Sequence, residues 1–316
     1  MFNGKRDSDG TRIKDLLTEL RSLALQNPGD PQLRSHLSRG LFSALTHVTE
    51  AEEQGERERI VQELRDLAGQ HPEDDVVRSN LARALFNTLN VAHSAGDPGG
   101  REAALQELRS LAAEHPQDET VQEHLAKALF NAMNYAKASE DHETRDALLE
   151  ELRGVNEGAG GRQATRLRLA KGLFNGVSHA IEEGRIERAR ELVGELRRLT
   201  SDHEDDPEVR ERLSKGLASL LHATCMSEDT SDADALLNEL RQMAGAHPEQ
   251  LVLRESLAMG LSDTLQLMGE EGDRGQRADL LDELRNLATD HPDAESIRAR
   301  LASGIANELS MAAHQN

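Results

Sequence analysis

The sequence predicts an all-α protein, an α/α superhelix of about 14 antiparallel helices, on three observations. The tripeptide Glu-Leu-Arg recurs at a constant 44-residue step through the chain. Each 44-residue unit contains two segments in which apolar residues follow helical spacing. Aromatic residues form only 2% of the 316 residues, which favours many thin helical layers over one thick core. Units that cannot bury their apolar faces alone must stack, so the pattern predicts a solenoid.

Two markers define seven units. The tripeptide begins at Glu19, Glu63, Glu107, Glu151, Glu195, Glu239 and Glu283. A small residue recurs at the same step, at Gly40, Ala84, Ala128, Gly172, Gly216, Gly260 and Gly304. Because glycine inside a helix costs about 1 kcal/mol relative to alanine, its recurrence indicates that neighbouring helices approach closely there. The Glu and Arg of the tripeptide, constant in every unit, are predicted to stabilise contacts between units.

The third unit shows how each pair of helices is bounded. A short helix is expected from Arg101 to Glu114, and Pro116 ends it because proline disfavours helix in the residue before it. Asp118 has the type and place of an N-cap for a long helix over about 119–138. The glycine-rich segment 96–100 is expected to be a connector. The same pattern places a short helix near 11–26 first and a long helix near 294–313 last.

These repeats are expected to form one solenoid domain over residues 1–316. The fourth unit replaces His-Pro with Gly158-Ala159-Gly160-Gly161. Because glycine tolerates unusual backbone angles, a flexible point is predicted near 156–162, with a tolerated loop variation as the alternative. The segment lacks the ending and the preceding strand of a phosphate-binding loop.

The formal net charge is −21, from 58 acidic and 37 basic residues. Such a surface repels a phosphate backbone, so nucleic acid is not an expected partner. Only six of the basic residues are lysine. An acidic, lysine-poor surface resembles proteins of salt-accumulating halophilic archaea, and a GC-rich genome that favours arginine codons is the alternative.

Cysteine usage and hydropathy indicate the compartment. A single cysteine, Cys225, excludes a disulfide framework and fits a reducing cytosol. No apolar signal region opens the sequence, and no apolar run approaches the roughly 18 residues of a membrane span. We therefore expect a cytoplasmic protein with no membrane partner, in which Cys225 is a small buried residue.

The short helix with its closing proline resembles the second helix of a tetratricopeptide repeat. That family's small, aromatic, small and proline positions are filled here by Ala104, Leu108, Leu111 and Pro116. The pair Leu81-Ala82 resembles the Leu-Gly of the family's first helix. Leucine at the aromatic positions and a period of 44 rather than about 34 are departures. HEAT-type units, which have a similar period, are the alternative.

Members of the tetratricopeptide family are typically scaffolds that bind peptides or proteins in a concave groove lined by their first helices. The resemblance implies a non-catalytic adaptor without a cofactor. Its groove would be lined by the long helices, and its partner would be a protein or peptide.

A first candidate binding surface is an arginine near the start of the long helices. It occurs at Arg34, Arg78, Arg166, Arg210, Arg254 and Arg298, with Gln122 as the exception. Guanidinium groups that face the groove would suit an extended carboxylate-rich or phosphorylated segment, because guanidinium pairs bidentately with both. The alternative is a structural ladder in which each arginine pairs with an acidic residue of the next unit.

A second candidate surface is a Phe-Asn pair within the long helices. It occurs as Phe86-Asn87, Phe130-Asn131 and Phe174-Asn175, with Phe42-Ser43 as a weaker version. Later units carry Ala218-Ser219, Ser262-Asp263 and Ala306-Asn307 instead. A row of Asn could clamp the backbone of an extended peptide, because an amide both donates and accepts hydrogen bonds. Alternatively, Phe fills the core and Asn caps a neighbouring loop.

No catalytic or metal-binding motif emerges. The repeated residue at the end of the short helices is His71, His115, His247 and His291. No His-Glu-x-x-His or Cys-x-x-Cys spacing occurs, and the carboxylates are spread along solvated faces. We expect no enzyme activity and no metal site. An enzyme built as a helical toroid with inward carboxylates is the alternative of that class.

The two ends of the array suggest a rival function. The first short helix carries Ile13, Leu16, Leu17 and Leu20, and the last long helix carries Ile297, Leu301, Ile305 and Leu309. Terminal repeats need polar outer faces to stay soluble as monomers, and these ends are not obviously capped. Self-assembly through the terminal repeats is therefore the alternative to a scaffold.

Overall fold

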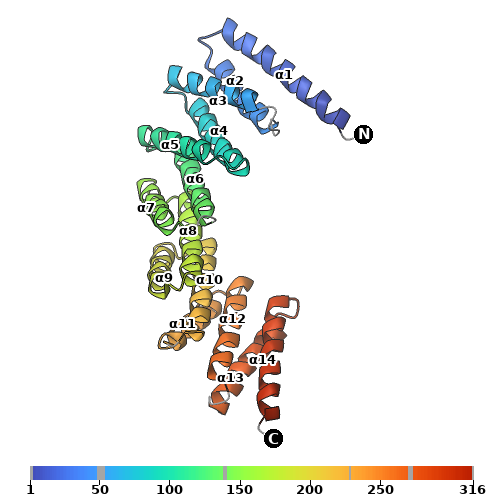
Figure 1. Ribbon diagram of the computed structural model, residues 1–316, viewed down its shortest axis with the longest axis vertical. Coiled ribbons are helices and arrows are strands. Elements are labelled where there is room, and N and C mark those ends of the chain that lie inside the picture. Colours follow the sequence, from blue (N-terminus) through green and yellow to red (C-terminus); the bar gives the residue numbers. More distant parts are fainter. Residues whose placement is uncertain (1–2, 48–53, 138–140, 228, 270–272, 315–316) are drawn as a thin grey trace. The chain divides into compact units, whose positions relative to one another are not determined.

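The computed structural model describes residues 3–47, 54–137, 141–227, 229–269 and 273–314 (Figure 1). Within these ranges the chain forms fourteen α-helices and no β-strand, which confirms the all-α prediction. The first seven helices are α1 (Asn3–Gln26), α2 (Pro31–His47), α3 (Gln54–Gln70), α4 (Asp75–Ser94), α5 (Pro98–Glu114), α6 (Glu119–Lys137) and α7 (His142–Gly158). The others are α8 (Gln163–Glu182), α9 (Ile186–Ser201), α10 (Pro207–Cys225), α11 (Ala233–Ala246), α12 (Leu251–Met268), α13 (Arg274–Asp290) and α14 (Glu295–His314). The even-numbered helices are the predicted long helices.

The boundary between α5 and α6 lies where the sequence predicts it. The N–H of His115 donates to the carbonyl of Leu111 and closes the last turn of α5. The Asp118 carboxylate then accepts hydrogen bonds from the N–H groups of Thr120 and Val121, at 3.1 Å each. This N-cap satisfies two of the donors that a helix start leaves without an intrahelical partner.

Helix α5 begins earlier than predicted. Asp97 accepts a hydrogen bond from the N–H of Gly100 at 2.9 Å, and Pro98 occupies the first turn. Proline is favourable there because its missing N–H would have no intrahelical partner and its φ is preset. Most of segment 96–100, expected to be a connector, is therefore helical.

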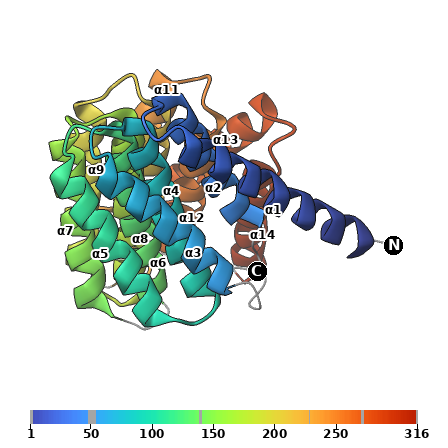
Figure 2. The same ribbon diagram turned by 90° about the horizontal axis from the view of Figure 1, so that it is seen from above.

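The chain divides into two compact units, residues 1–169 and 170–316. In the first unit, α2 packs against α4 and α4 packs against α6. Helix α3 contacts both α2 and α4, and α5 contacts both α4 and α6. Figures 1 and 2 show α3, α5 and α7 as one layer beside α4 and α6. Helices α3 and α5 thus each cover the seam between two even-numbered helices.

The second unit repeats this packing. Helix α10 contacts α9, α11 and α12, and α12 contacts α11, α13 and α14. The division between the units falls within α8, beyond the glycine-rich segment that was expected to be a flexible point. In that segment Gly160 and Gly161 have φ of 66° and 64°, a backbone conformation that favours glycine.

The leucine of the tripeptide forms the centre of the core. Six of these side chains are 0% exposed: Leu64, Leu108, Leu152, Leu196, Leu240 and Leu284. Complete burial of one leucine stabilises the fold by roughly 1.5–3 kcal/mol. A Cβ atom on Gly40 would lie 2.8 Å from Cδ2 of Leu20, and one on Gly260 would lie 3.0 Å from Cδ1 of Leu240. Glycine at these two positions therefore allows the close approach that the sequence predicts.

The charged residues of the tripeptide link successive odd-numbered helices. The arginine of one unit pairs with the glutamate of the next unit at 2.7–2.9 Å. The pairs are Arg21–Glu63, Arg65–Glu107, Arg109–Glu151, Arg197–Glu239 and Arg241–Glu283. These contacts match the predicted structural role of the tripeptide.

Two of the apolar residues expected to be open at the ends of the array are in fact buried. Leu17 is 5% exposed because it faces α2, and Ile297 is 0% exposed. Leu16 and Leu309 are exposed, as expected. None of the helices, over their described residues, is long and apolar enough to cross a membrane.

Candidate functional site

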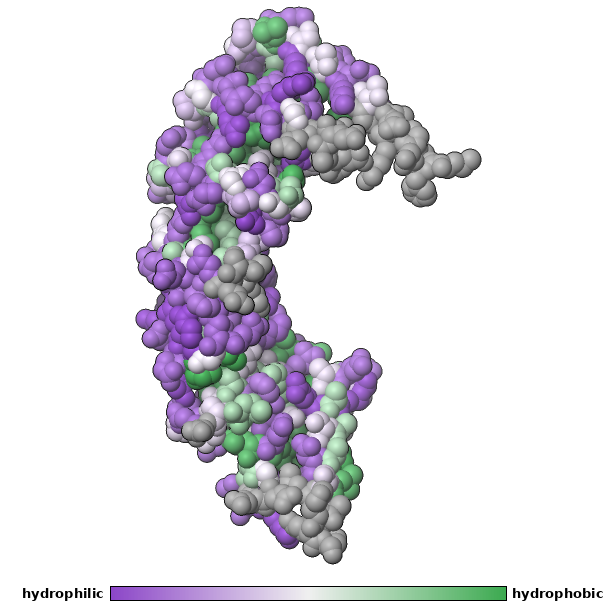
Figure 3. Space-filling view, in the orientation of Figure 1, coloured by the Kyte–Doolittle hydropathy of each residue, from purple (hydrophilic) through white to green (hydrophobic). Residues whose placement is uncertain are grey.

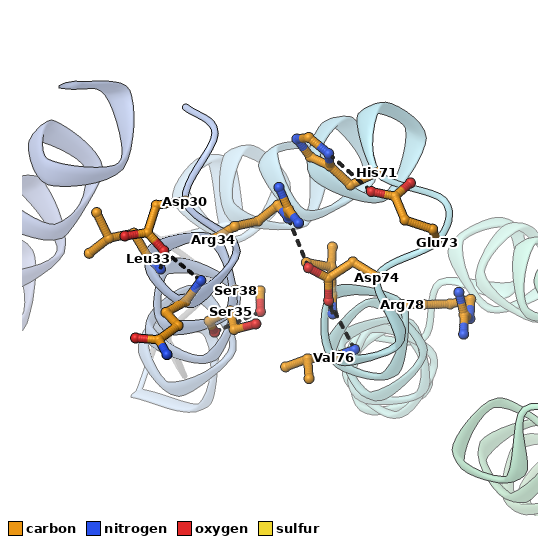
Figure 4. A network of polar contacts seen from close by, with 12 residues as sticks. Asp30, Leu33, Arg34, Ser35, Ser38, His71, Glu73, Asp74, Val76 and Arg78 are labelled. Carbon is orange, nitrogen blue, oxygen red and sulfur yellow. Dashed lines mark hydrogen bonds and ion pairs between the residues drawn. The ribbon is translucent and has the colours of Figure 1, made fainter. Parts of the chain in front are cut away.

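Arg34 joins α2 to the first turn of α4 (Figure 4). Its Nε lies 2.8 Å from Oδ2 of Asp74, and Oδ1 of Asp74 accepts hydrogen bonds from two N–H groups at the start of α4. The two side chains are only 13% and 8% exposed. Arg78 of α4 makes the same bridge to Asp118 at the start of α6, with an Nε–Oδ2 distance of 2.7 Å.

The Arg34–Asp74 pair holds the carboxylate in its ionised form. Partial burial by itself raises the pKa of Asp74. Hydrogen bonds from Arg34 and from the Val77 N–H, together with the positive charge of Arg34, outweigh burial and hold the pKa below its ordinary value. Asp74 therefore acts both as a helix cap and as the partner of an arginine from the preceding repeat.

The other arginines of this series also contact the protein itself. Each donates to a backbone carbonyl shortly before its own helix: Arg166 to Gly161, Arg210 to Glu204, Arg254 to Pro248 and Arg298 to Pro292. Arg210 also donates to Gln250 at 2.7 Å. Gln122, the exception, donates to the Ala112 carbonyl at 2.9 Å. Arg34 and Arg78 make the ion pair that the structural alternative expects, whereas these hydrogen bonds of the other residues are to backbone carbonyls or an amide. Binding of a partner by these arginines stays a prediction.

The Phe-Asn pairs lie half-buried at contacts between successive even-numbered helices. The rings of Phe86 and His124 pack in a T-shaped arrangement, with centroids 5.9 Å apart and planes at 74°. Arg168 of α8 lies over Phe130, with its Cζ 6.0 Å from the ring centroid. Each ring therefore supports a contact between repeats while part of it stays accessible.

The asparagines of these pairs differ in their contacts. Asn131 donates a hydrogen bond to Oδ1 of Asn90 at 2.8 Å. Asn87 is half-buried, and no hydrogen bond of its side chain is found within the described ranges. In α8, Phe174 and Asn175 are half-buried as well. The Asn131 amide is thus already engaged by a neighbouring helix.

A basic row, which the sequence reasoning overlooked, lies on α2, α4 and α6. It consists of Arg39, Arg83 and Lys127, each three residues before a Phe. Arg39 and Arg83 are exposed, and neither has an ion pair in the part of the chain that the structure describes. Lys127 is half-buried and lies 2.5 Å from Glu123. The 44-residue step could have revealed the row, since basic residues recur at Arg39, Arg83, Lys127, Lys171 and Lys215.

An aromatic cluster lies toward the C-terminal end of α4. Tyr135 of α6 stacks on His93 with ring centroids 3.5 Å apart and planes at 10°. Its hydroxyl donates to Oδ1 of Asn90 at 2.8 Å, and Arg101 lies over its ring at 5.8 Å. Burial raises the pKa of Tyr135. A cavity of about 370 Å³, lined in part by Arg101, Tyr135 and Thr144, adjoins the cluster.

Helices α10 and α12 lack this combination of side chains, whereas α8 keeps Lys171 three residues before the half-buried Phe174. Met259 of α12 takes the place of the basic residue, and Ala218 and Ser262 take the place of Phe. Asp263 is buried, and its carboxylate lies 3.2 Å from Nδ1 of His222. Helix α12 therefore carries a buried carboxylate where α4, α6 and α8 carry an amide.

Other reactive groups form no recognisable centre. No three His, Cys, Asp or Glu side chains among the described residues gather so that they could hold a metal ion. Cys225 is half-buried rather than fully buried as predicted. Burial, with a smaller effect of the Asp263 charge, raises its pKa to about 11. The thiol is therefore protonated at neutral pH and is a poor nucleophile.

Comparison with known proteins finds no family model that matches this sequence and no curated protein that is similar to it.

Proposed function

We propose that this protein is a non-catalytic, tetratricopeptide-like scaffold of the cytoplasm that binds an extended acidic segment of a partner protein. The proposed binding face is formed by α2, α4 and α6. The observation that carries the proposal is a basic side chain one turn before a half-buried Phe on three successive helices. The pairs are Arg39 with Phe42, Arg83 with Phe86 and Lys127 with Phe130.

Helix packing supports the tetratricopeptide-like assignment. Helices α3 and α5 cover the seams between α2, α4 and α6, so each of these even-numbered helices keeps one face uncovered. In the tetratricopeptide family that uncovered face, on the first helix of each repeat, is the one that receives peptides. The cytoplasmic assignment rests on the single free cysteine, Cys225, because one cysteine cannot form an intramolecular disulfide framework.

The spacing of the helices suits an extended ligand. Packed helices lie about 8–10 Å apart, and an extended chain in the polyproline II conformation rises about 3.1 Å per residue with three residues per turn, so every third side chain lies on one face. A peptide that crosses α2, α4 and α6 therefore advances by about three residues per helix. Acidic residues at every third position would meet Arg39, Arg83 and Lys127 in turn.

The side chains around the row supply the other contacts of a peptide site. The exposed guanidinium groups of Arg39 and Arg83 can each take a carboxylate bidentately. The Asn87 amide can donate to and accept from the peptide backbone. The accessible parts of Phe42 and Phe86 offer apolar contact to the intervening side chains. With a net charge of −21, the protein repels acidic segments at long range, so binding depends on this local row once salt has screened the rest.

A binding titration tests this proposal. Fluorescence anisotropy would follow a labelled peptide with glutamate at every third position as the full chain is added. We expect saturable binding that weakens about tenfold in the Arg39→Gln/Arg83→Gln double variant, because two exposed charge pairs contribute about 0.5–1 kcal/mol each. A peptide with lysine in place of glutamate should not bind.

The matched control is Arg59→Gln. Arg59 lies on α3, away from this face, and its side chain is 79% exposed beside Glu56. Arg83→Gln and Arg59→Gln change the net charge equally, but only Arg83 lies on the proposed binding face. Only Arg83→Gln should therefore weaken binding. Equal loss in both variants, or no saturable binding by the wild-type chain, would refute the proposal.

A further inference from the structure

The outer face of α1 exposes a side chain that every later repeat buries. Leu16 is 55% exposed. Residues at the equivalent place in the later repeats are only 1–7% exposed: Ile60, Ala104, Leu148, Leu192, Leu236 and Leu280. In those repeats the odd-numbered helix packs against the preceding even-numbered helix, as α3 does on α2 and α13 on α12. Leu16 is thus a core residue whose neighbouring layer is missing.

Helix α14 presents the complementary face. Leu309 is 66% exposed and Ile305 is 36% exposed. Residues equivalent to Leu309 are 0–2% exposed: Leu45, Leu89, Met133, Val177, Leu221 and Leu265. Those equivalent to Ile305 are 0–1% exposed: Leu41, Leu85, Leu129, Leu173, Leu217 and Leu261. Figure 3 shows hydrophobic surface over α14, at the right of the lower half of the view.

The group that should cover Leu309 can be named from the repeat. Leu265 of α12 lies beside Gly304 of α14, so that a Cβ on this glycine would be 3.4 Å from its Cδ1. Leu221 lies in the same way beside Gly260 of α12. The equivalent glycine of the first repeat is Gly40 of α2. Helix α2 of another chain therefore has the shape to cover Leu309.

The α1–α2 end and the α13–α14 end also carry opposite charges at positions that pair between neighbouring repeats. Glu19 of α1 occupies the place of Glu63 and is exposed, with no ion pair within the described residues. Arg285 of α13 occupies the place of Arg241, and its side chain is 51% exposed beside Asp282 of its own helix. Between neighbouring repeats inside the array, the equivalent arginine and glutamate form an ion pair, as Arg241 does with Glu283 at 2.9 Å.

A second charged pair follows the same rule. Asp30 caps α2, accepting from the N–H of Gln32 at 2.8 Å. Its equivalents Asp74 and Asp118 each receive an arginine from the preceding repeat. In the last repeat, Arg298 of α14 is equivalent to these donors, Arg34 and Arg78, and it is exposed. A chain whose α2 packs on α14 would bring Asp30 to Arg298.

We propose that a second copy of this chain docks its α1–α2 end on the α13–α14 end of the first, continuing the 44-residue array head to tail. Leu16 then covers Ile305 and Leu309, Glu19 pairs with Arg285, and Asp30 pairs with Arg298. Such a contact uses two different surfaces, so it leaves one free end of each kind and adds further copies. The inference is independent of peptide binding, because the basic row lies on another face.

Light scattering coupled to size exclusion, over a series of concentrations of the full chain, tests the proposal. The wild-type mass should rise with concentration beyond that of one chain. Leu16→Glu and Leu309→Glu should each remain at the mass of one chain, because each variant loses one of the two surfaces. Both side chains are exposed, so the fold is retained, which circular dichroism checks.

Mixing the two variants gives the decisive result. Leu16→Glu keeps an intact α14 face and Leu309→Glu keeps an intact α1 face, so an equimolar mixture should reach the mass of two chains and no more. Leu25→Glu is the matched control, since Leu25 is 83% exposed and its equivalents Gly69 and Glu157 are also exposed. That variant should associate like the wild type. A monomeric wild type, a mixture that stays monomeric, or one variant that still dimerises alone would overturn the proposal.

Discussion

The guanidinium group of Arg65 donates two hydrogen bonds to the carboxylate of Glu107, with Nε–Oε1 at 2.7 Å and Nη2–Oε2 at 2.8 Å. This pair joins α3 to α5 across a seam of the first unit. The hydrogen bond to Glu107 is the largest cause that raises the pKa of Arg65. The equivalent pair recurs in both units, so it regularly joins one odd-numbered helix to the next.

We expect a double-mutant cycle of Arg65→Gln and Glu107→Gln to give a coupling free energy of about 0.5–1 kcal/mol. The pair is bidentate but 37% and 31% exposed, so solvent screens much of its energy. Urea unfolding measures the four stabilities. The control cycle is Arg59→Gln with Glu56→Gln, a single-contact pair on α3 whose arginine is 79% exposed. A larger coupling in the control would contradict the assignment of Arg65 as a link.

Arg78→Gln should reduce the free energy of unfolding by about 1–2 kcal/mol. It leaves the Asp118 carboxylate, only 9% exposed, without its charged partner. Arg83→Gln, the same change one and a half turns later on α4, should stay within about 0.5 kcal/mol of the wild type because Arg83 is exposed. Urea unfolding compares them. If Arg78→Gln proved neutral and instead weakened peptide binding, the arginine series would be a binding surface after all.

The contribution of Asp74 to stability should vanish in acid. The pKa of its carboxyl is lower in the folded chain than the ordinary value of about 3.9. A group of this kind stabilises the fold above its unfolded pKa, and its contribution is lost as the pH falls through the folded pKa. Asp74→Asn should therefore be less stable than the wild type at pH 7, with the difference shrinking in strong acid. Asp75→Asn, at an exposed neighbour, controls for the loss of charge. A difference that is constant from neutral to acid pH would exclude this linkage.

Gly260→Ala and Gly194→Ala should differ in stability by about 1–3 kcal/mol. A Cβ at Gly260 would lie 2.8 Å from Leu221 and 3.0 Å from Leu240 in a packed core, so overpacking opposes the gain in helix propensity. A Cβ at Gly194, also within a helix, meets nothing within 4 Å, so alanine there should stabilise by up to about 1 kcal/mol. Thermal unfolding of the two variants measures this, and equal stabilities would argue against close packing at Gly260.

Cys225 should react slowly with a disulfide reagent in the native protein. A pKa of about 11 leaves roughly 100-fold less thiolate at pH 8 than an ordinary cysteine has. The absorbance of the released thiol gives the rate, with the urea-unfolded chain as the reference. Similar rates in the two states would show that burial does not protect the thiol.

Most of the architecture could be predicted from the sequence because its causes are local or periodic. The N-cap at Asp118 and the helix end at His115 depend on neighbouring residues alone. The start of α5 was misplaced because Asp97 and Pro98 outweigh two following glycines that read as a connector. Repetition also indicated that the Glu and Arg of the tripeptide are structural, since a residue constant in every unit serves the contacts that every unit shares.

The direction of individual side chains was decided by tertiary packing. The sequence by itself established the 44-residue period, the alternation of helices and the leucine core. It could not distinguish Arg34, whose side chain reaches Asp74 of the next repeat, from Arg39, which stays exposed five residues later. The rotation of a helix about its axis depends on the neighbours that pack on it, and here that rotation is fixed by contacts about 40 residues away along the chain. Those contacts exist only in the folded protein, so only the folded protein shows which arginines face solvent.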